Sequence, residues 1–284
     1  MTVPLTEYNT NTKPTWCPGC GNYIINTAIK KTLSELDIKP SQAFISFDIG
    51  CNGNGADKIK VNAFKGLHGR AIALAIGSHL ANRKMTVITD IGDGGALHEG
   101  IEHLIHAIRS NYDITILIHN NENFALTTGQ ATATTPEGKP MYGLPQGRPE
   151  REMYISDLVL SQRATFFARA YSGDLQQMVE IFKSAINHKG CSIVEILQSC
   201  PTYNREATPQ WFAQRIQKLN QPAQSIEEAL KISKIPKKIN TGIIYQDESI
   251  PVFYNRLENR KDSTTELVDE VQNYDISNLL KHLD

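Results

Sequence analysis

Short apolar segments rich in Ile and Val alternate with longer amphipathic segments along the first two hundred residues. Four of the apolar segments predict buried strands, at residues 43–48, 85–90, 114–119 and 192–198. Helices are predicted at residues 23–36, 71–82, 96–110 and 175–187, where apolar side chains recur at the helical spacing, most clearly in 96–110. This alternation predicts an α/β fold: a doubly wound, mostly parallel sheet with helices on both faces.

Two segments depart from the alternation. Residues 127–152 are rich in Gly, Pro and Thr and too long for a plain connection, so we expect a functional or partner-covering loop. From about residue 209 the alternation stops, and we expect helices and irregular chain that end in a polar helix at 263–283. The sequence therefore predicts a main domain over 1–208 and a C-terminal extension over 209–284, which packs on that domain or on a partner subunit.

Composition and charge narrow the class of protein. Of the 284 residues, 40% are hydrophobic and 21% charged, and the formal net charge is −1, which argues against nucleic-acid binding through a basic face. No segment approaches the ~20 apolar residues that span a membrane, and the first residues lack the pattern of a secretory signal. We therefore expect a cytoplasmic protein, in which clustered cysteines hold metal more often than they form disulfides.

The five cysteines are unevenly placed. Cys17 and Cys20 form a C-x-x-C pair, whose spacing alone fits zinc, a redox dithiol or iron–sulfur ligation. Cys51 and Cys200 each follow a predicted strand, so the four could share one rim of a parallel sheet and complete a Cys₄ site for a [4Fe–4S] cluster. Cys191 precedes the last predicted strand and is expected to be a small buried hydrophobic residue.

A second pattern combines glycine, aspartate and asparagine. Gly92–Asp93–Gly94 follows the second predicted strand, and Asn121 lies 28 residues after Asp93, at the end of the third. The glycines let the backbone turn close to a pyrophosphate, and carboxylate and amide oxygens are ligands that Mg²⁺ accepts. This spacing is typical of thiamine diphosphate binding, although a plain turn and a plain loop would also explain the two parts separately.

Several stretches resemble one enzyme family when they are taken together. They are WCPGCGN (16–22), IGCNGNG (49–55), LHGRA (67–71), GDGG…LHEGIEHLIHAIRSN (92–111), HNNENFALTTGQATATTP (119–136) and HKGCSIVEILQSCPTYN (188–204). In this order, over roughly residues 14 to 205, the sequence resembles the β subunit of 2-oxoacid:ferredoxin oxidoreductases, which act on pyruvate or 2-oxoglutarate. The joint match is specific, whereas the GDG or C-x-x-C motif alone is not.

The resemblance implies a set of site residues. The ligands of one [4Fe–4S] cluster would be Cys17, Cys20, Cys51 and Cys200. Mg²⁺ would be held by the side chains of Asp93 and Asn121 and by the backbone carbonyl of Asn123. The residues expected to line thiamine diphosphate are Ile49, Gly50, Cys51, Asn52, His68, Gly94, Gly95, Ala125 and Leu126. Arg70 would either contact phosphate or brace the loop around His68.

The resemblance also implies an activity and partners. The family carries out thiamine-dependent oxidative decarboxylation of a 2-oxoacid to acyl-CoA and CO₂, and passes electrons through the cluster to ferredoxin. The activating glutamate is expected from an α (or fused α/γ) subunit in a heterodimer, so no catalytic residue is assigned here. Gly95 stands where relatives often carry Asp, and Thr128, where some carry Lys or Gly, slightly favours pyruvate or another monocarboxylate. The alternatives are a non-redox thiamine decarboxylase or carboligase, and a cofactor-binding subunit without turnover.

Overall fold

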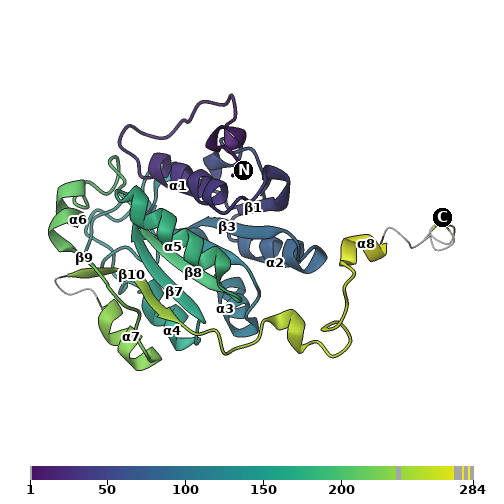
Figure 1. Cartoon of the computed structure of the whole chain (residues 1–284). Coiled ribbons are helices and arrows are strands. Elements are labelled where there is room, and N and C mark those ends of the chain that lie inside the picture. Colours follow the sequence, from purple (N-terminus) through teal and green to yellow (C-terminus); the bar gives the residue numbers. More distant parts are fainter. Residues whose placement is uncertain (1, 235–237, 272–276, 278–280, 282–284) are drawn as a thin grey trace.

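The computed structural model describes residues 2–234, 238–271, 277 and 281. Within these ranges eight strands form one sheet in the order β2-β1-β3-β4-β8-β7-β10-β9, and β5 and β6 form a separate two-stranded ladder (Figure 1). The strands of the main sheet are β1 Ala43–Phe47, β2 Asn62–Lys65, β3 Thr86–Gly92, β4 Thr115–Asn120, β7 Phe166–Tyr171, β8 Ser192–Leu197, β9 Ile216–Lys218 and β10 Ile239–Gln246. The short ladder pairs β5 Asn123–Phe124 with β6 Gln130–Ala131.

The helices lie between these strands. They are α1 Asn22–Glu35, α2 Ala71–Ala81, α3 Ile101–Ser110, α4 Ile155–Ser161, α5 Leu175–Asn187, α6 Pro209–Arg215, α7 Ile226–Ser233 and α8 Leu267–Val271. Single helical turns of other types are η1 Leu5–Tyr8, η2 Pro40–Gln42, η3 Asn52–Gly55, η4 Gly95–Glu99, η5 Ala125–Thr127 and η6 Phe253–Arg256. No helix of the described residues is long and apolar enough to cross a membrane.

The sheet buries both of its faces. Along β4, Ile116 and Ile118 belong to the core formed with α2, α3, α4 and α7, whereas Leu117 belongs to the core formed with α1 and α5. Figure 1 shows α1 and α5 together on one side of the sheet. Because successive strand residues point to opposite faces, a strand that is covered on both sides is apolar at every position. This confirms the predicted doubly wound, mostly parallel α/β sheet.

Strand β7 was not predicted from the sequence, and it contains a charged residue. Arg169 is 1% exposed, and its Nε donates to Glu195 Oε2 of β8 at 2.7 Å. Its Nη1 donates to the backbone carbonyl of Ser233 at 3.0 Å, and Asn120 Nδ2 donates to Glu195 Oε1 at 2.8 Å. The ion pair thus has further hydrogen-bond partners, as buried charges require. An arginine in the middle of Phe166–Tyr171 interrupts the apolar run that would have identified a strand.

Two further expectations were wrong. The helix predicted over 96–110 is divided into a π-helical turn, η4, and α3, with the break at Gly100. The region after residue 209 is not only helical and irregular, because β9 and β10 extend the main sheet and β10 pairs antiparallel with β7. The division into a 1–208 domain and a 209–284 extension stays a prediction.

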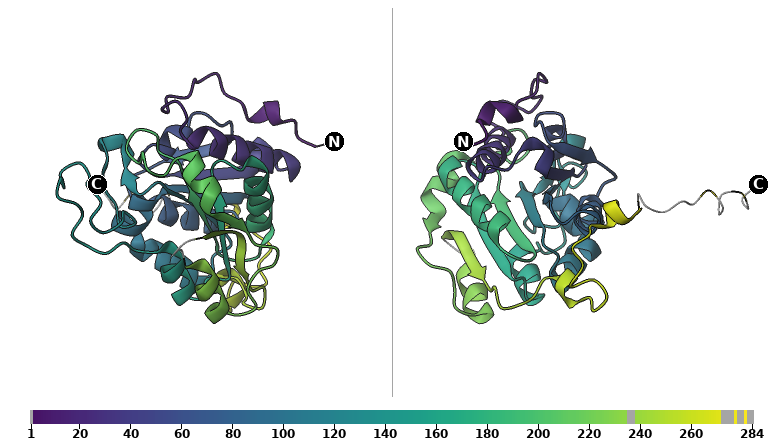
Figure 2. Two further views of the ribbon diagram at one scale, coloured as in Figure 1. Left: turned by 90° about the vertical axis from the view of Figure 1, so that its left-hand side faces the viewer. Right: turned by 45° about the vertical axis from the view of Figure 1, so that its right-hand side comes forward.

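The C-terminal segment returns to the other end of the sheet (Figure 2). Arg83, just after α2, donates from Nε and Nη2 to the two carboxylate oxygens of Glu266, both at 3.0 Å, and its guanidinium lies 3.7 Å from the ring centre of Tyr254. Glu266 is 4% exposed, so a bidentate ion pair between a buried carboxylate and the half-buried Arg83 ties the segment to the end of α2. About half of the polar helix predicted at 263–283 lies outside the described residues, and the described part contains the short helix α8.

The buried Arg169–Glu195 pair yields a first prediction. Arg169→Met should lower the free energy of unfolding by roughly 3–5 kcal/mol, because Glu195 would keep a buried charge without its cation. The double variant Arg169→Met, Glu195→Gln should recover most of that loss. Urea unfolding measures both, and Lys31→Met, which breaks the exposed Lys31–Glu35 pair, is the control. Equal losses in the single and double variants would contradict this account of the pair.

Candidate active site at the carboxyl edge of the sheet

Four loops meet at one edge of the sheet. They follow β1, β3, β4 and β8, which are parallel neighbours in the order β1-β3-β4-β8. The register places Phe47 beside Asp90, Gly92 beside His119 and Asn120 beside Leu197, so the strands end at similar heights. Ligands bind at this edge in doubly wound folds.

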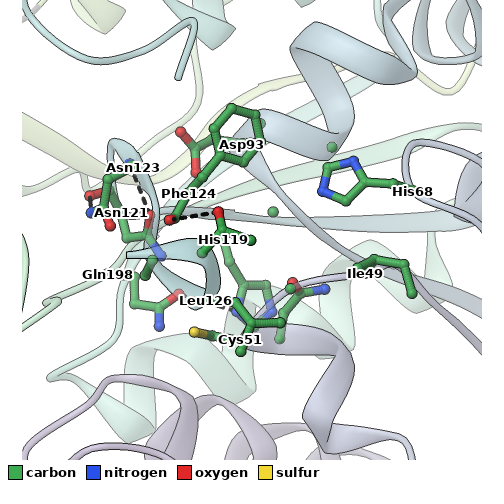
Figure 3. Close-up of a pocket in the computed structure, with 17 residues that line it drawn as sticks. Ile49, Cys51, His68, Asp93, His119, Asn121, Asn123, Phe124, Leu126 and Gln198 are labelled. Atoms are coloured by element: carbon green, nitrogen blue, oxygen red, sulfur yellow. Dashed lines mark hydrogen bonds between the residues drawn. The ribbon is translucent and has the colours of Figure 1, made fainter. Parts of the chain in front are cut away.

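A small cavity of about 70 Å³ lies among these loops (Figure 3). We name it the Asp93 cavity. Its lining residues are Ile49, Gly50, Cys51, Asn52, His68, Gly92, Asp93, Gly94, Gly95, His119, Asn121, Asn123, Phe124, Ala125, Leu126, Thr127 and Gln198. The structure therefore brings together, around one space, every residue expected to contact thiamine diphosphate or Mg²⁺.

Asp93 is held by two hydroxyl groups. Its Oδ2 accepts hydrogen bonds from Thr132 Oγ1 at 2.5 Å and from Thr134 Oγ1 at 2.6 Å. Burial raises the pKa of Asp93 to about 6, although the two threonine hydrogen bonds act in the opposite direction. The carboxylate is 1% exposed and its pKa is also raised by the charge of Glu122, so a cation would be a favourable partner.

Asn121 and Asn123 form a tight turn next to Asp93. The Asn121 Oδ1 accepts the backbone N–H of Asn123 at 3.0 Å, and Asn123 Nδ2 donates to the Asn121 carbonyl at 2.7 Å. Glu122 between them has a positive φ of 61°. Lys139 and Asn204 both donate to Glu122 Oε2, at 3.1 Å, which anchors the turn to the long loop and to the segment after β8.

A buried polar network lies beneath the cavity. The His119 Nε2 is 3.2 Å from Asp90 Oδ2, and its Nδ1 is 3.0 Å from Asn22 Oδ1 and 3.2 Å from Gln198 Oε1. Asn52 Nδ2 donates to Asp90 Oδ1 at 3.1 Å. The network links β3, β4 and the start of α1 to the segments that follow β1 and β8, so it fixes the spacing of the loops that form the cavity.

The His68 loop closes another side. His68 Nδ1 is 3.1 Å from Glu99 Oε2, and the His68 ring centre is 5.8 Å from that of Phe124. Arg70 Nη1 donates to the Glu99 carbonyl and, at 3.2 Å, to Glu102 Oε1. Of the two roles considered for Arg70, these contacts favour bracing the loop. Gly100 permits this arrangement, because a Cβ there would lie 2.5 Å from the Gly69 carbonyl oxygen.

A second cavity of about 210 Å³ adjoins the first, and we name it the cysteine cavity. Its lining includes Cys17, Cys20, Cys51 and Cys200. It shares Cys51, Asn121, Ala125, Leu126 and Gln198 with the Asp93 cavity, and these five residues form the common wall. All five cysteines of the chain are free thiols. Within the described ranges no three His, Cys, Asp or Glu side chains converge on a single point that could hold one metal ion.

Specific contacts hold two of the four cysteines, Cys51 and Cys20, at this space. Trp16 Nε1 donates to the Cys51 carbonyl at 2.6 Å, and Gln198 Nε2 lies 3.6 Å from Cys20 Sγ. Gly21 lets α1 approach β8, because a Cβ there would lie 2.7 Å from Gln198 Cγ. Burial raises the pKa of Cys51 to about 12, and the neighbouring thiols add to this rise through mutual charge repulsion.

Cys191 lies apart from these four residues. It is fully buried in the core with α2, α3, α4 and α7, and its backbone N–H donates to Asn111 Oδ1 at 2.8 Å. The prediction that Cys191 is a small buried hydrophobic residue is confirmed.

Comparisons with known proteins agree with this geometry. Residues 48–196 match the C-terminal TPP binding domain of thiamine pyrophosphate enzymes, and residues 200–262 match the C-terminal part of the pyruvate ferredoxin oxidoreductase beta subunit. The beta subunit of 2-oxoacid:ferredoxin oxidoreductase 1 from Aeropyrum pernix is 35% identical over 271 residues, which cover 90% of this chain and 85% of that protein. The chain belongs to the 2-oxoacid:ferredoxin oxidoreductase beta subunit family.

Other members of the family support the same assignment. The beta subunit from Saccharolobus solfataricus is 34% identical over 264 residues, covering 87% of each chain. The solved structure of the 2-oxoglutarate:ferredoxin oxidoreductase from Magnetococcus marinus, with 2-oxoglutarate, coenzyme A and succinyl-CoA bound, superimposes with a TM-score of 0.87 at 26% identity. This match covers 99% of this chain and 96% of the other. The resemblance noted in the sequence and the predicted fold are both confirmed, and residues 48–196 are a thiamine diphosphate-binding domain.

Several site residues of this family member were not predicted from sequence. Thr132 and Thr134 hold Asp93, His119 lines the Asp93 cavity and contacts Gln198, and Gln198 lines both cavities. A signal existed for the second pair, since His119 and Gln198 are polar residues at the ends of predicted apolar strands. The threonines lie within a threonine-rich loop, where the sequence offers no reason to choose two of them.

The raised pKa of Asp93 yields a prediction for the protein without cofactors. A carboxyl whose pKa is about 6 in the folded chain, against an ordinary 3.8, binds its proton more tightly there than in the unfolded chain. Stability is therefore lost as pH rises from about 4 to about 6. Asp93→Asn removes this loss, so its gain in unfolding free energy over the native protein should be larger at pH 8 than at pH 5, by on the order of 1 kcal/mol. Urea unfolding at both values measures this, and a pH-independent difference would contradict it.

Proposed function

We propose that this chain is the β subunit of an enzyme that oxidatively decarboxylates a 2-oxoacid, pyruvate or 2-oxoglutarate, to acyl-CoA and CO₂. Electrons would leave through one [4Fe–4S] cluster to ferredoxin. The observation that carries the proposal is the wall shared by the Asp93 cavity and the cysteine cavity. A non-redox thiamine enzyme would have no use for four thiols beside its cofactor pocket.

The Asp93 cavity suits the diphosphate end of thiamine diphosphate. Asp93 and Asn121 would hold Mg²⁺ by their side-chain oxygens and Asn123 by its carbonyl, because oxygen donors are what this ion prefers. A buried carboxylate whose hydrogen-bond donors are neutral threonine hydroxyls suits a divalent cation. The expected lining residues of the cofactor are Ile49, Gly50, Cys51, Asn52, His68, Gly94, Gly95, Ala125 and Leu126, all at this cavity.

The cysteine cavity suits a cluster. Cys17, Cys20, Cys51 and Cys200 provide the four thiolates that a [4Fe–4S] cluster takes. They surround a space of about 210 Å³. Burial and, after it, the mutual repulsion of the thiolates raise the pKa of Cys51, and cations at the centre of the cavity would oppose both effects. Gln198 would donate a hydrogen bond to the Cys20 sulfur.

The residues of this chain would position the bound groups. Thiamine diphosphate, when bound, supplies an electron sink for decarboxylation. Thr132 and Thr134 would hold Asp93 toward the ion, while the His119 network keeps the four loops at constant spacing. Leu126 lies on the wall that the two cavities share. The wall is formed by side chains that contact both cavities, so the two groups would be neighbours.

The active site would be completed by a partner subunit. The Asp93 cavity, at about 70 Å³, is far smaller than the 300–1,000 Å³ that usually encloses a ligand of cofactor size. This chain would therefore cover only part of the cofactor. An α (or fused α/γ) subunit would cover the remainder and supply the activating glutamate. Residues 1–208 would form the cofactor-binding domain, and 209–284 would pack on it or on that partner.

Matched cysteine variants test the proposal. The anaerobically purified complex should contain about four irons per β subunit, the count of one such cluster. Cys51→Ser should lose most of this iron because it removes a ligand, whereas Cys191→Ser should retain it. Metal and thiamine analysis of the same samples measures both cofactors. Stoichiometric zinc without iron, or equal iron loss in the two variants, would contradict the assignment.

A further inference from the structure

Gly95 lies against a buried carboxylate from another strand. A Cβ added at Gly95 would be 2.0 Å from Asp48 Oδ2 and 3.0 Å from Asp48 Cγ. Real Cβ atoms do not approach so closely, so no side chain fits at position 95 while Asp48 holds this conformation. The two residues are 47 positions apart in sequence, and they meet because β1 and β3 are neighbouring parallel strands.

The carboxylate of Asp48 connects two loops of the Asp93 cavity. Its Oδ1 accepts the backbone N–H of Gly69 at 2.7 Å, which anchors the loop that carries His68. Its Oδ2 has no hydrogen-bond partner and lies against the turn at Gly95. Asp48 is fully buried, and an unpaired buried carboxylate oxygen is costly, which points to a role other than stability.

Two charged side chains near Asp48, those of His68 and Glu99, influence its carboxyl group. Burial raises the pKa of Asp48 to about 6, the charge of His68 lowers it, and the charge of Glu99 raises it. His68 lines the cavity and lies 3.1 Å from Glu99 through Nδ1. Asp48 thus holds this loop through the Gly69 N–H, and Glu99 of the π-helical turn lies against His68 itself.

We propose that Asp48 is a positioning residue of the thiamine diphosphate pocket, and that its carboxylate occupies the place of a side chain at position 95. The Asp48 carboxylate, which directly follows β1, lies between the His68–Gly69 loop and the Gly94–Gly95 turn and holds them at a constant separation. The inference rests on the proposed function, since it concerns the same pocket. It also accounts for Gly95, which the sequence left unexplained.

The proposal makes positions 48 and 95 interdependent. Asp48→Ala removes the carboxylate, and Gly95→Asp forces a second one into occupied space, so each single change should weaken cofactor binding. The double variant Asp48→Ala, Gly95→Asp returns one carboxylate to the vacated place and should bind more tightly than either single variant. Asp48→Asn fills the same space without charge, so Asp48→Asn, Gly95→Asp should not recover.

The test is calorimetric titration of thiamine diphosphate with Mg²⁺ into the assembled, cofactor-stripped αβ complex. We expect Asp48→Ala to weaken binding by about tenfold or more, as for a lost charge-assisted hydrogen bond, and the double variant to regain most of it. Asp57→Ala, at an exposed aspartate that pairs with Lys58, should bind like the native protein.

The possible results distinguish failure of the role of Asp48 from failure of the proposed function. Native affinity in Asp48→Ala, or a double variant no better than the weaker single variant, would overturn the inference and leave the proposed function intact. Failure of the native complex to bind thiamine diphosphate would overturn both. If Asp48→Ala does not fold, Asp48→Asn takes its place: it should fold and bind more weakly than native, and native affinity there would equally refute the role of the charge.

Discussion

The parallel alignment of β1, β3, β4 and β8 is the constraint on which the site depends. Parallel neighbours in register end at the same edge, so the segments after Phe47, Gly92, Asn120 and Leu197 must meet there. The two cores that cover the sheet hold this alignment, because a shift of one residue would move each side chain out of the core in which it is packed and into the other. Residues that are far apart in sequence thereby become the walls of two adjoining cavities.

Buried polar groups at this edge of the sheet lower the stability of the folded chain, but they suit the binding of a cation. Asp48 and Asp93 both have a pKa raised to about 6 by burial, and Asp48 retains an oxygen without a hydrogen-bond partner. Such groups reduce the stability of the unliganded chain, and a bound cation would offset part of that cost. The large apolar cores elsewhere make this tolerable. Concentrated unfavourable charge of this kind is typical of functional sites.

The sequence predicted what depends on local pattern and could not predict what depends on distant contact. Four strands, the paired turns at Asp93 and Asn121, and the cysteine rim follow from periodicity and spacing, and the structure places the expected residues around two joined cavities. Strand β7 was not predicted because Arg169 interrupts its apolar run, and only the structure shows that Glu195 lies beside this arginine. The reason for a glycine at position 95 could not be predicted either, since it depends on the side chain of Asp48, 47 residues away in the sequence.

The central claim is that electrons pass from thiamine diphosphate in the Asp93 cavity to a [4Fe–4S] cluster in the cysteine cavity. The most direct measurement is electron paramagnetic resonance of the anaerobic αβ complex, frozen after mixing with pyruvate or 2-oxoglutarate in the absence of ferredoxin. The account predicts that the signal of a reduced cluster appears in the native complex, and that neither the isolated β chain nor the Cys51→Ser complex shows it. Release of CO₂ from the 2-oxoacid while the cluster of the native complex stays oxidised would contradict it.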